Sequence, residues 1–356
     1  MKRVLAAAAS CCLLLSAPAA AQQPSMTAHF IDVGQAHATL LEFACGAMLV
    51  DAGADEQHDG TLVAYLGAFF RRRKDLDSTL GVVLITHNHK DHTQSLRAVI
   101  DAGFRIVHYI DNGFTQGSGV ANPNWLKAEA RAGRLPIAVR EITERAVEAA
   151  PGHTGLRDTD IDPFECDSVN PQIRILTGSR RDDNPGWPEG DFDNQNNHSL
   201  VTRVDFGKAS FLFMGDLEER GIESLLDFYG DAFTGVLNTD VLQVGHHGSN
   251  NATSAELLKA VTPNVAVIPM GAWTFGQGSG SRFTTFAYGH PRQSTVTLLA
   301  ASIARKRPQP RTVMLGVRGF HFEQGIVRRA IYATGWDGNV RVVATPQGTF
   351  TVYREH

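Results

Sequence analysis

The strongest constraint on this chain is a run of four potential metal ligands within six consecutive residues, His87, His89, Asp91 and His92. The run follows an apolar segment, residues 80–85, which predicts a buried strand. In an extended segment, side chains two residues apart point to the same side, so the first two histidines are expected to face one point. Asp91 and His92 come after the chain begins to turn and are expected to face a second point. Because one metal ion needs only three or four ligands, the pattern favours two adjacent ions over isolated core or surface histidines.

The first 21 residues have the pattern of a targeting segment. Lys2 and Arg3 form a basic start, Val4 to Leu15 is apolar, and Ala19-Ala20-Ala21 is a small-residue cleavage site. The apolar run is too short to span a membrane. We therefore expect residues 1–21 to be a signal peptide and the mature protein to be periplasmic or secreted, with no membrane span.

Composition restricts the remaining classes of protein. The formal charge of the whole chain is −4 and becomes more negative without the basic residues of the first segment, which argues against broad non-specific binding to nucleic acid. Cys45 and Cys166 remain after cleavage, and an oxidising compartment would allow them to pair, although the sequence does not place them together. We expect residues 22–356 to form a single domain.

Short strands are predicted at residues 27–33, 38–43 and 47–51, separated by turn residues. Polar residues stand at the ends of these strands. Asp32, His37 and Asp51 are therefore expected either to support metal ligands or, for the two carboxylates, simply to hold turns.

A helix is predicted at residues 61–73, ending in the basic run Arg71-Arg72-Arg73-Lys74. This run either contacts phosphate or lies solvated at the helix C-terminus, where the helix dipole favours positive charge. Residues 111–193 are irregular and rich in Gly, Pro and Asn, with a short helix predicted from residue 125 to 131. We expect this region to be a variable insertion near the active site, with Trp125, Trp187 and Phe192 either lining its wall or anchoring surface loops.

Three later strand ends also carry His or Asp. A strand at residues 209–214 ends in Gly215-Asp216, a strand at residues 239–244 ends in Gly245-His246-His247-Gly248-Ser249, and Tyr288-Gly289-His290-Pro291 precedes a helix predicted at residues 293–304. Thr253-x-x-Glu256 predicts a capping box, and residues 339–353 predict a hairpin. Packing alone does not explain so many imidazoles at strand ends.

These motifs together resemble the metallo-β-lactamase superfamily, and within it the hydrolase domain of ComEC competence proteins and related secreted phosphodiesterases. The similar segments are Phe30-Ile31-Asp32-Val33-Gly34-Gln35, the histidine-rich run, Asn197-x-Ser199-Leu200-Val201, Phe213-Met214-Gly215-Asp216-Leu217-Glu218, Val244-Gly245-His246-His247-Gly248-Ser249 and Tyr288-Gly289-His290-Pro291. The resemblance implies an α+β fold, a four-layer αββα sandwich with a dinuclear site between the edges of two sheets.

The resemblance also implies a ligand set. His87 and His89 would bind the first metal, Asp91 and His92 the second, and Asp216 would bridge both. His247 is the preferred last ligand of the second site, with the reverse assignment of His246 left open. The related sequences usually have Asn where this chain has His198, which lies 18 residues before Asp216. That interval resembles the spacing of the third histidine in other superfamily members, so we expect His198 to complete the first site.

The implied cofactors are two divalent ions, zinc with manganese or iron as alternatives. A hydroxide bridging them would be the nucleophile, oriented by Asp91, while His246 or His290 would contact the substrate or protonate a leaving group. The alternative for His290 is a structural role at the entry of the following helix. We expect a phosphodiesterase or nuclease acting on a small-molecule or nucleic-acid phosphoester. The alternatives are hydrolysis of lactones, thioesters or β-lactams at the same site, and a non-enzymatic ligand-binding protein.

Overall fold

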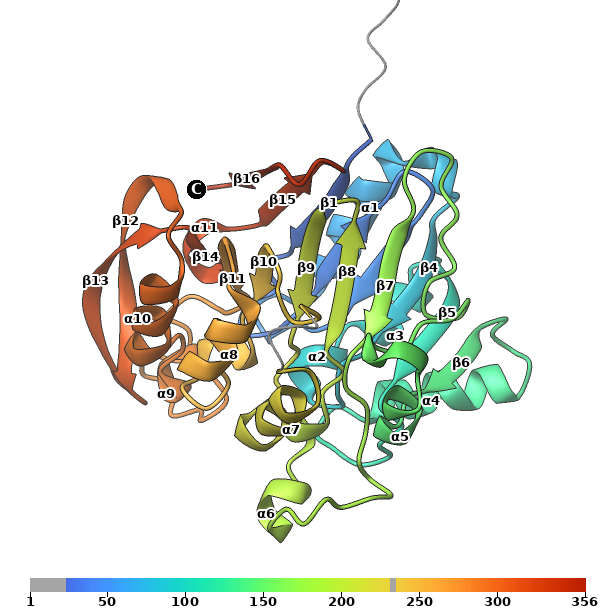
Figure 1. The fold of residues 1–356 in the computed structure, drawn as a ribbon, viewed down its shortest axis with the longest axis horizontal. Helices are drawn as coiled ribbons and strands as arrows, with labels where there is room; N and C mark the ends of the chain where they lie inside the picture. The colour runs from blue at the N-terminus through green and yellow to red at the C-terminus, as the bar shows by residue number, and fades with distance from the viewer. Residues whose placement is uncertain (1–23, 231–234) are drawn as a thin grey trace, which may run out of the picture.

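Two β-sheets lie face to face in the computed structural model, which describes residues 24–230 and 235–356 (Figure 1). The predicted signal peptide lies outside the described residues. Helices cover the outer face of each sheet, so the order of layers is helix, sheet, sheet, helix. The expected α+β, four-layer αββα fold is confirmed.

The first sheet has eight strands in the order β16-β15-β1-β2-β3-β4-β5-β6. Its strands from β16 to β3 pair antiparallel, whereas β3 to β6 pair parallel. The carboxyl ends of these parallel strands therefore meet at one edge of the sheet. The bounds are β1 Met26–Phe30, β2 Thr39–Glu42, β3 Ala47–Val50, β4 Thr79–Leu84, β5 Arg105–Asp111, β6 Ala138–Glu141, β15 Val340–Ala344 and β16 Phe350–Arg354.

The second sheet has six strands in the order β14-β11-β10-β9-β8-β7. From β9 to β14 the strands are parallel, and β7, β8 and β9 form an antiparallel meander. The bounds are β7 Pro171–Ile175, β8 Thr202–Phe206, β9 Ala209–Phe213, β10 Val241–Gln243, β11 Val265–Ile268 and β14 Ile331–Ala333. A separate hairpin, β12 Lys306–Arg318 and β13 His321–Arg329, projects beside this sheet (Figure 1).

Apolar side chains between the sheets form the larger core. The rings of Phe30 and Phe213, one from each sheet, stack with centroids 6.2 Å apart. The longer outer helices bury one face each on the sheets: α1 Thr61–Arg72, α3 Leu96–Asp101 and α4 Ala121–Arg131 on the first, and α7 Glu219–Tyr229, α8 Ala255–Val261 and α10 Gln293–Ser302 on the second. The short helices are α2 Lys90–Thr93, α5 Glu144–Glu148, α6 Glu189–Phe192, α9 Thr285–Tyr288 and α11 Thr334–Asp337.

The predicted elements agree with these bounds to within a few residues, with two informative differences. The cap of α8 is Ser254, whose side chain accepts from the Leu257 amide, and not the predicted Thr253. The region 111–193 is only partly an insertion, because it supplies β6 and β7, the outermost strands of the two sheets. Its irregular composition hid two strands that belong to the fold.

A disulfide joins Cys45 and Cys166 across a sequence separation of 121 residues. It links the turn between β2 and β3 to the segment that leads into β7, and thus ties the first sheet to an edge strand of the second. Among residues 24–230 and 235–356, no helix combines the length and hydropathy needed to cross a bilayer.

Removing this disulfide by the double substitution C45A/C166A is expected to destabilise the protein by about 2–5 kcal/mol, because the open loop regains conformational freedom in the unfolded state. The measurement is urea unfolding with and without reductant. Reductant should lower the midpoint of the wild type and leave that of the double variant unchanged. Free thiols in unreduced, denatured mature protein would contradict the pairing.

Candidate metal centre

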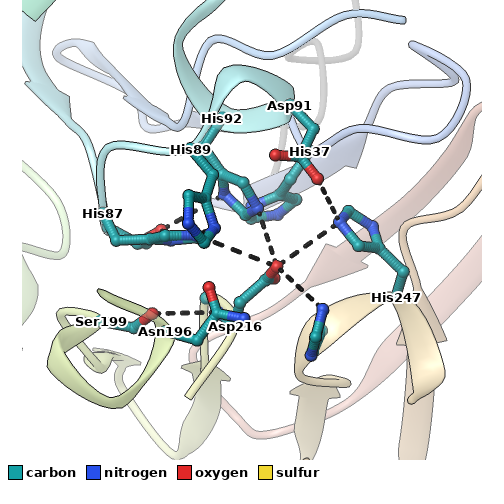
Figure 2. Close-up of polar contacts among 12 residues, drawn as sticks. His37, His87, His89, Asp91, His92, Asn196, Ser199, Asp216 and His247 are labelled. Carbon is teal, nitrogen blue, oxygen red and sulfur yellow. Dashed lines mark hydrogen bonds and ion pairs between the residues drawn. The ribbon is translucent and has the colours of Figure 1, made fainter. Parts of the chain in front are cut away.

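The predicted ligands other than His198 gather at one place, where strands from both sheets end (Figure 2). The loop after β4 carries the histidine-rich run, the turn after β9 carries Asp216, and the turn after β10 carries His246 and His247. His246 and His247 both adopt the left-handed backbone conformation, with φ of 45° and 51°. Such strain at consecutive non-glycine residues is typical of a functional turn.

Four side chains form the tightest group. One ligand atom from each of Asp91, His92, Asp216 and His247 lies within 4.8 Å of the others. Asp216 Oδ2 is 3.2 Å from His92 Nε2 and 3.6 Å from His247 Nε2, and Asp91 Oδ2 is 3.2 Å from His247 Nε2. The other nitrogen of His247, Nδ1, donates to the Pro269 carbonyl at 2.7 Å, which leaves Nε2 free to face the group. These four residues are the ligands predicted for the second site, and of the later histidine pair it is His247 that lies among them.

His87 and His89 lie on the adjacent side of Asp216. Their facing ring nitrogens, His87 Nε2 and His89 Nδ1, are 3.0 Å apart, and His87 Nε2 is 4.0 Å from Asp216 Oδ2. Burial, reinforced by the neighbouring histidines, lowers the pKa of His87 well below its usual value, so its ring is neutral and able to coordinate. Asp216 is thus positioned between the two predicted halves.

Asp51 supports these ligands through a set of buried hydrogen bonds. Its fully buried carboxylate accepts hydrogen bonds from the Thr86 amide at 2.7 Å, the Thr86 hydroxyl at 2.9 Å, His92 Nδ1 at 2.6 Å and His37 Nδ1 at 2.7 Å. Burial alone would raise the pKa of Asp51, but His92 and His37 outweigh it and keep the carboxyl ionised. Since Nδ1 of His92 is occupied, the ring must present Nε2 to the cluster. Carboxylates commonly orient metal-binding histidines in this way.

The residues fit divalent metal ions. His92 Nε2 is buried and has no hydrogen-bond partner, although it lies beside a carboxylate. Burial alone would also raise the pKa values of Asp91 and Asp216, but nearby imidazoles outweigh it and hold both below the usual range. Two ionised carboxylates side by side, Asp216 buried and Asp91 half-buried, favour a bound cation between them. The mixed imidazole and carboxylate donors suit zinc, manganese or iron.

His198 does not join this cluster, so the expectation that it completes the first site is wrong. Its Nδ1 accepts from the Arg180 amide at 3.1 Å, and its Nε2 donates to the Phe192 carbonyl at 2.7 Å. The ring packs among Phe192, Phe114 and Trp187, with centroids 4.7–5.7 Å away. With both nitrogens used by backbone groups, the side chain helps to fasten the loop of residues 180–198.

His246 faces the cluster from the more exposed side. Its Nε2 lies 3.9 Å from Asp216 Oδ2, and its Nδ1 lies 3.0 Å from Glu218 Oε1. The same Glu218 carboxylate accepts from the side-chain amides of Asn196 and Asn194, both at 2.7 Å. Glu218 was not among the predicted site residues. The sequence feature that could have indicated Glu218 is its position as a second carboxylate, two residues after Asp216.

His290 also reaches the site, with its ring centroid 5.5 Å from that of His246 and 6.2 Å from that of His247. Its Nδ1 lies 3.2 Å from Gln35 Nε2. The orientation of this amide is fixed because Gln35 Oε1 accepts from the Thr285 hydroxyl and the Gly271 amide. The amide nitrogen must therefore donate to Nδ1 of the ring, which leaves the His290 proton on Nε2.

The other residues singled out in the sequence have supporting or structural positions. Asp32 holds a turn, since its carboxylate accepts from the Gly34 amide, whereas His37 supports the cluster through Asp51. Of the possible wall residues, Trp125 stacks under Arg97, while Trp187 and Phe192 pack around His198. Two residues of the basic run at the end of α1, Arg72 and Arg73, are not free for phosphate, because they pair with Glu42.

Residues 31–272 match the Metallo-beta-lactamase superfamily, and the chain belongs to this family. Competence protein ComA of Neisseria gonorrhoeae is 28% identical over 240 residues, covering 67% of this chain and 26% of ComA. ComE operon protein 3 of Bacillus subtilis is 32% identical over 105 residues, covering 30% of this chain and 11% of that protein. These matches confirm the resemblance to competence proteins, although the chain spans only about a quarter or less of their length.

Among solved structures, the metallo-beta-lactamase fold protein YhfI from Bacillus subtilis aligns with a TM-score of 0.40 and 11% identity, covering 69% of this chain and 85% of YhfI. Human tRNase Z, short form, aligns with a TM-score of 0.36 and 14% identity, covering 68% of this chain and 91% of the enzyme.

The substitution D51N is expected to weaken metal binding about 10- to 100-fold, because the amide cannot accept all the hydrogen bonds that orient His92. Competition with a chromophoric chelator measures this change. The matched control is E42Q, which removes another histidine-paired carboxylate, 3.1 Å from His29 Nε2, outside the cluster. Equal metal affinity in D51N and E42Q would show that Asp51 has no orienting role.

The substitution H198A is expected to leave the metal content unchanged and to cost about 1–3 kcal/mol of stability, because it removes two buried hydrogen bonds. H87A should instead lose metal. Elemental analysis after dialysis, paired with thermal unfolding, distinguishes the two effects. Loss of one ion per chain in H198A would restore that residue as a ligand.

Proposed function

We propose that this protein is an extracytoplasmic metal-dependent phosphodiesterase, with nucleic acid among its candidate substrates. The observation that carries the proposal is the position of Asp216, whose Oδ2 lies near His92 and His247 on one side and near His87 on the other. A carboxylate shared by two adjacent cation sites suits phosphoester hydrolysis, in which both the attacking and the leaving oxygen need positive charge nearby.

Bound divalent ions would supply charge neutralisation at the phosphoryl oxygens and an acidified water. The residues of the chain perform the other tasks. Asp91, ionised and 3.2 Å from His247 Nε2, offers a carboxylate oxygen that would orient a water molecule by accepting its hydrogen bond. Asp51 keeps His92 in the coordinating orientation through the contact to Nδ1.

Two histidines are placed to contact the substrate. His290 presents an N–H at Nε2 because Gln35 occupies Nδ1. Nδ1 of His246 lies against Glu218, and Nε2 on the other side of the same ring therefore faces Asp216. Both groups suit donation of a hydrogen bond to a phosphoryl oxygen or of a proton to the leaving group.

The extracytoplasmic location rests on two observations. The first 21 residues have the pattern of a signal peptide, and Cys45 and Cys166 form a disulfide, which is typical of oxidising compartments. DNA uptake does not enter the proposal, because the matched competence proteins are about four or more times longer than the aligned segment.

Metal-loaded mature protein is expected to hydrolyse bis(p-nitrophenyl) phosphate, and D216N to reduce the rate at least about 100-fold, because that substitution removes the charge shared by both halves. The release of nitrophenolate measures the rate, and E42Q serves as the control. Hydrolysis of a lactone or of nitrocefin without phosphodiester hydrolysis would favour an acyl hydrolase and overturn the proposal. Absence of all three activities in protein carrying two metals would also overturn it.

A further inference from the structure

The orientation of the Asn196 amide is fixed by its neighbour. Asn196 Nδ2 lies 2.7 Å from Glu218 Oε1. Since a carboxylate can only accept, the nitrogen of the amide must face Glu218 and the oxygen must face the other way. Asn196 is 5% exposed, and its Oδ1 is buried without a hydrogen-bond partner. A buried acceptor with no donor costs free energy unless something positive meets it.

The backbone turn places Asn196 beside Asp216. Residues Gln195–His198 form a 3-10 turn ending at Ser199. In such a turn, side chains three residues apart lie on the same side. Ser199 Oγ accepts from the Asp216 amide at 3.2 Å, so Asn196 shares the face that contacts Asp216. Figure 2 shows Asn196 beside Asp216 on the side of His87 and His89, with His247 on the other side.

This half of the centre is short of a ligand. His87, His89 and the shared Asp216 are its contributors, whereas His198 is held away by backbone groups. The other half already has Asp91, His92 and His247 in addition to Asp216. The unpartnered oxygen therefore belongs to a side chain that lies beside Asp216, next to the half that lacks a donor.

We propose that the amide oxygen of Asn196 is the remaining protein ligand of the cation held by His87 and His89. A neutral amide oxygen is a harder and weaker donor than imidazole. The first half therefore binds its ion less tightly than the second half and accepts manganese or iron more readily than a three-histidine site would. The assignment rests on metal binding in the proposed function and does not depend on which ester is hydrolysed.

The test compares N196A with N197A in the full mature chain. Asn197 is an equally buried neighbour, but its amide is satisfied on both sides, by the Asp191 carbonyl and the Gly221 amide. Calorimetric titration of metal-free protein with Mn²⁺ and Zn²⁺ should resolve two binding events in the wild type and in N197A. In N196A the weaker event is expected to lose affinity at least about tenfold. Two events of wild-type affinity in N196A would overturn the assignment.

A second variant covers the case in which N196A fails to fold. N196D keeps an oxygen in place and adds charge, so it should retain two ions and shift the Co²⁺ absorption bands of the weaker site. Unchanged bands in N196D would also overturn the assignment. Because these readouts are metal affinity and Co²⁺ spectra, inactivity toward phosphodiesters would count against the proposed function and leave the ligand assignment standing.

Discussion

The buried carboxylate of Asp51 is the contact on which the metal centre depends. It lies just after β3, and its hydrogen bonds reach the next parallel strand end through Thr86, α2 through His92, and the loop before β2 through His37. Neither a strand end nor a four-residue helix holds a side chain rigidly on its own. Because one anion joins them, the imidazole of His92 has a single permitted orientation, and the main-chain path of the histidine-rich run follows from it.

Much of this centre could be predicted from the sequence, because its determinants are local. Apolar runs ending in Gly, Asp or His marked the ends of β4, β9 and β10, and parallel strands bring such ends to a common edge. The structure accordingly brings together His87, His89, Asp91, His92, Asp216 and His247. The wrong prediction, His198, relied on an interval of sequence. An interval fixes distance along the chain but not the direction of a side chain, and in the 3-10 turn His198 and Asn196 point to different sides.

Features that depend on residues far apart in the sequence were harder to predict from the sequence. The pairing of Cys45 with Cys166 spans 121 residues, and no local pattern reports that separation in space. β6 and β7 were missed because they are short edge strands in a stretch dominated by turn residues, and their identity depends on neighbours already in place. The disulfide and these strands belong together physically. The bridge fastens the long connection between β6 and β7 to the first sheet, near its crossing from one sheet to the other.

Glu218 connects the two functional parts of the centre. Its Oε1 accepts a hydrogen bond from the Asn196 side-chain amide at 2.7 Å and lies 3.0 Å from Nδ1 of His246. One oxygen therefore orients both side chains. Burial alone would raise the pKa of Glu218, but His246 and the two asparagines outweigh it, and the carboxylate stays ionised. An ionised Glu218 attracts the amide nitrogen of Asn196 and Nδ1 of His246, so the amide oxygen of Asn196 and Nε2 of His246 lie on the sides that face away from Glu218. The same charge therefore orients the proposed ligand on one side of Asp216 and the proposed substrate contact on the other.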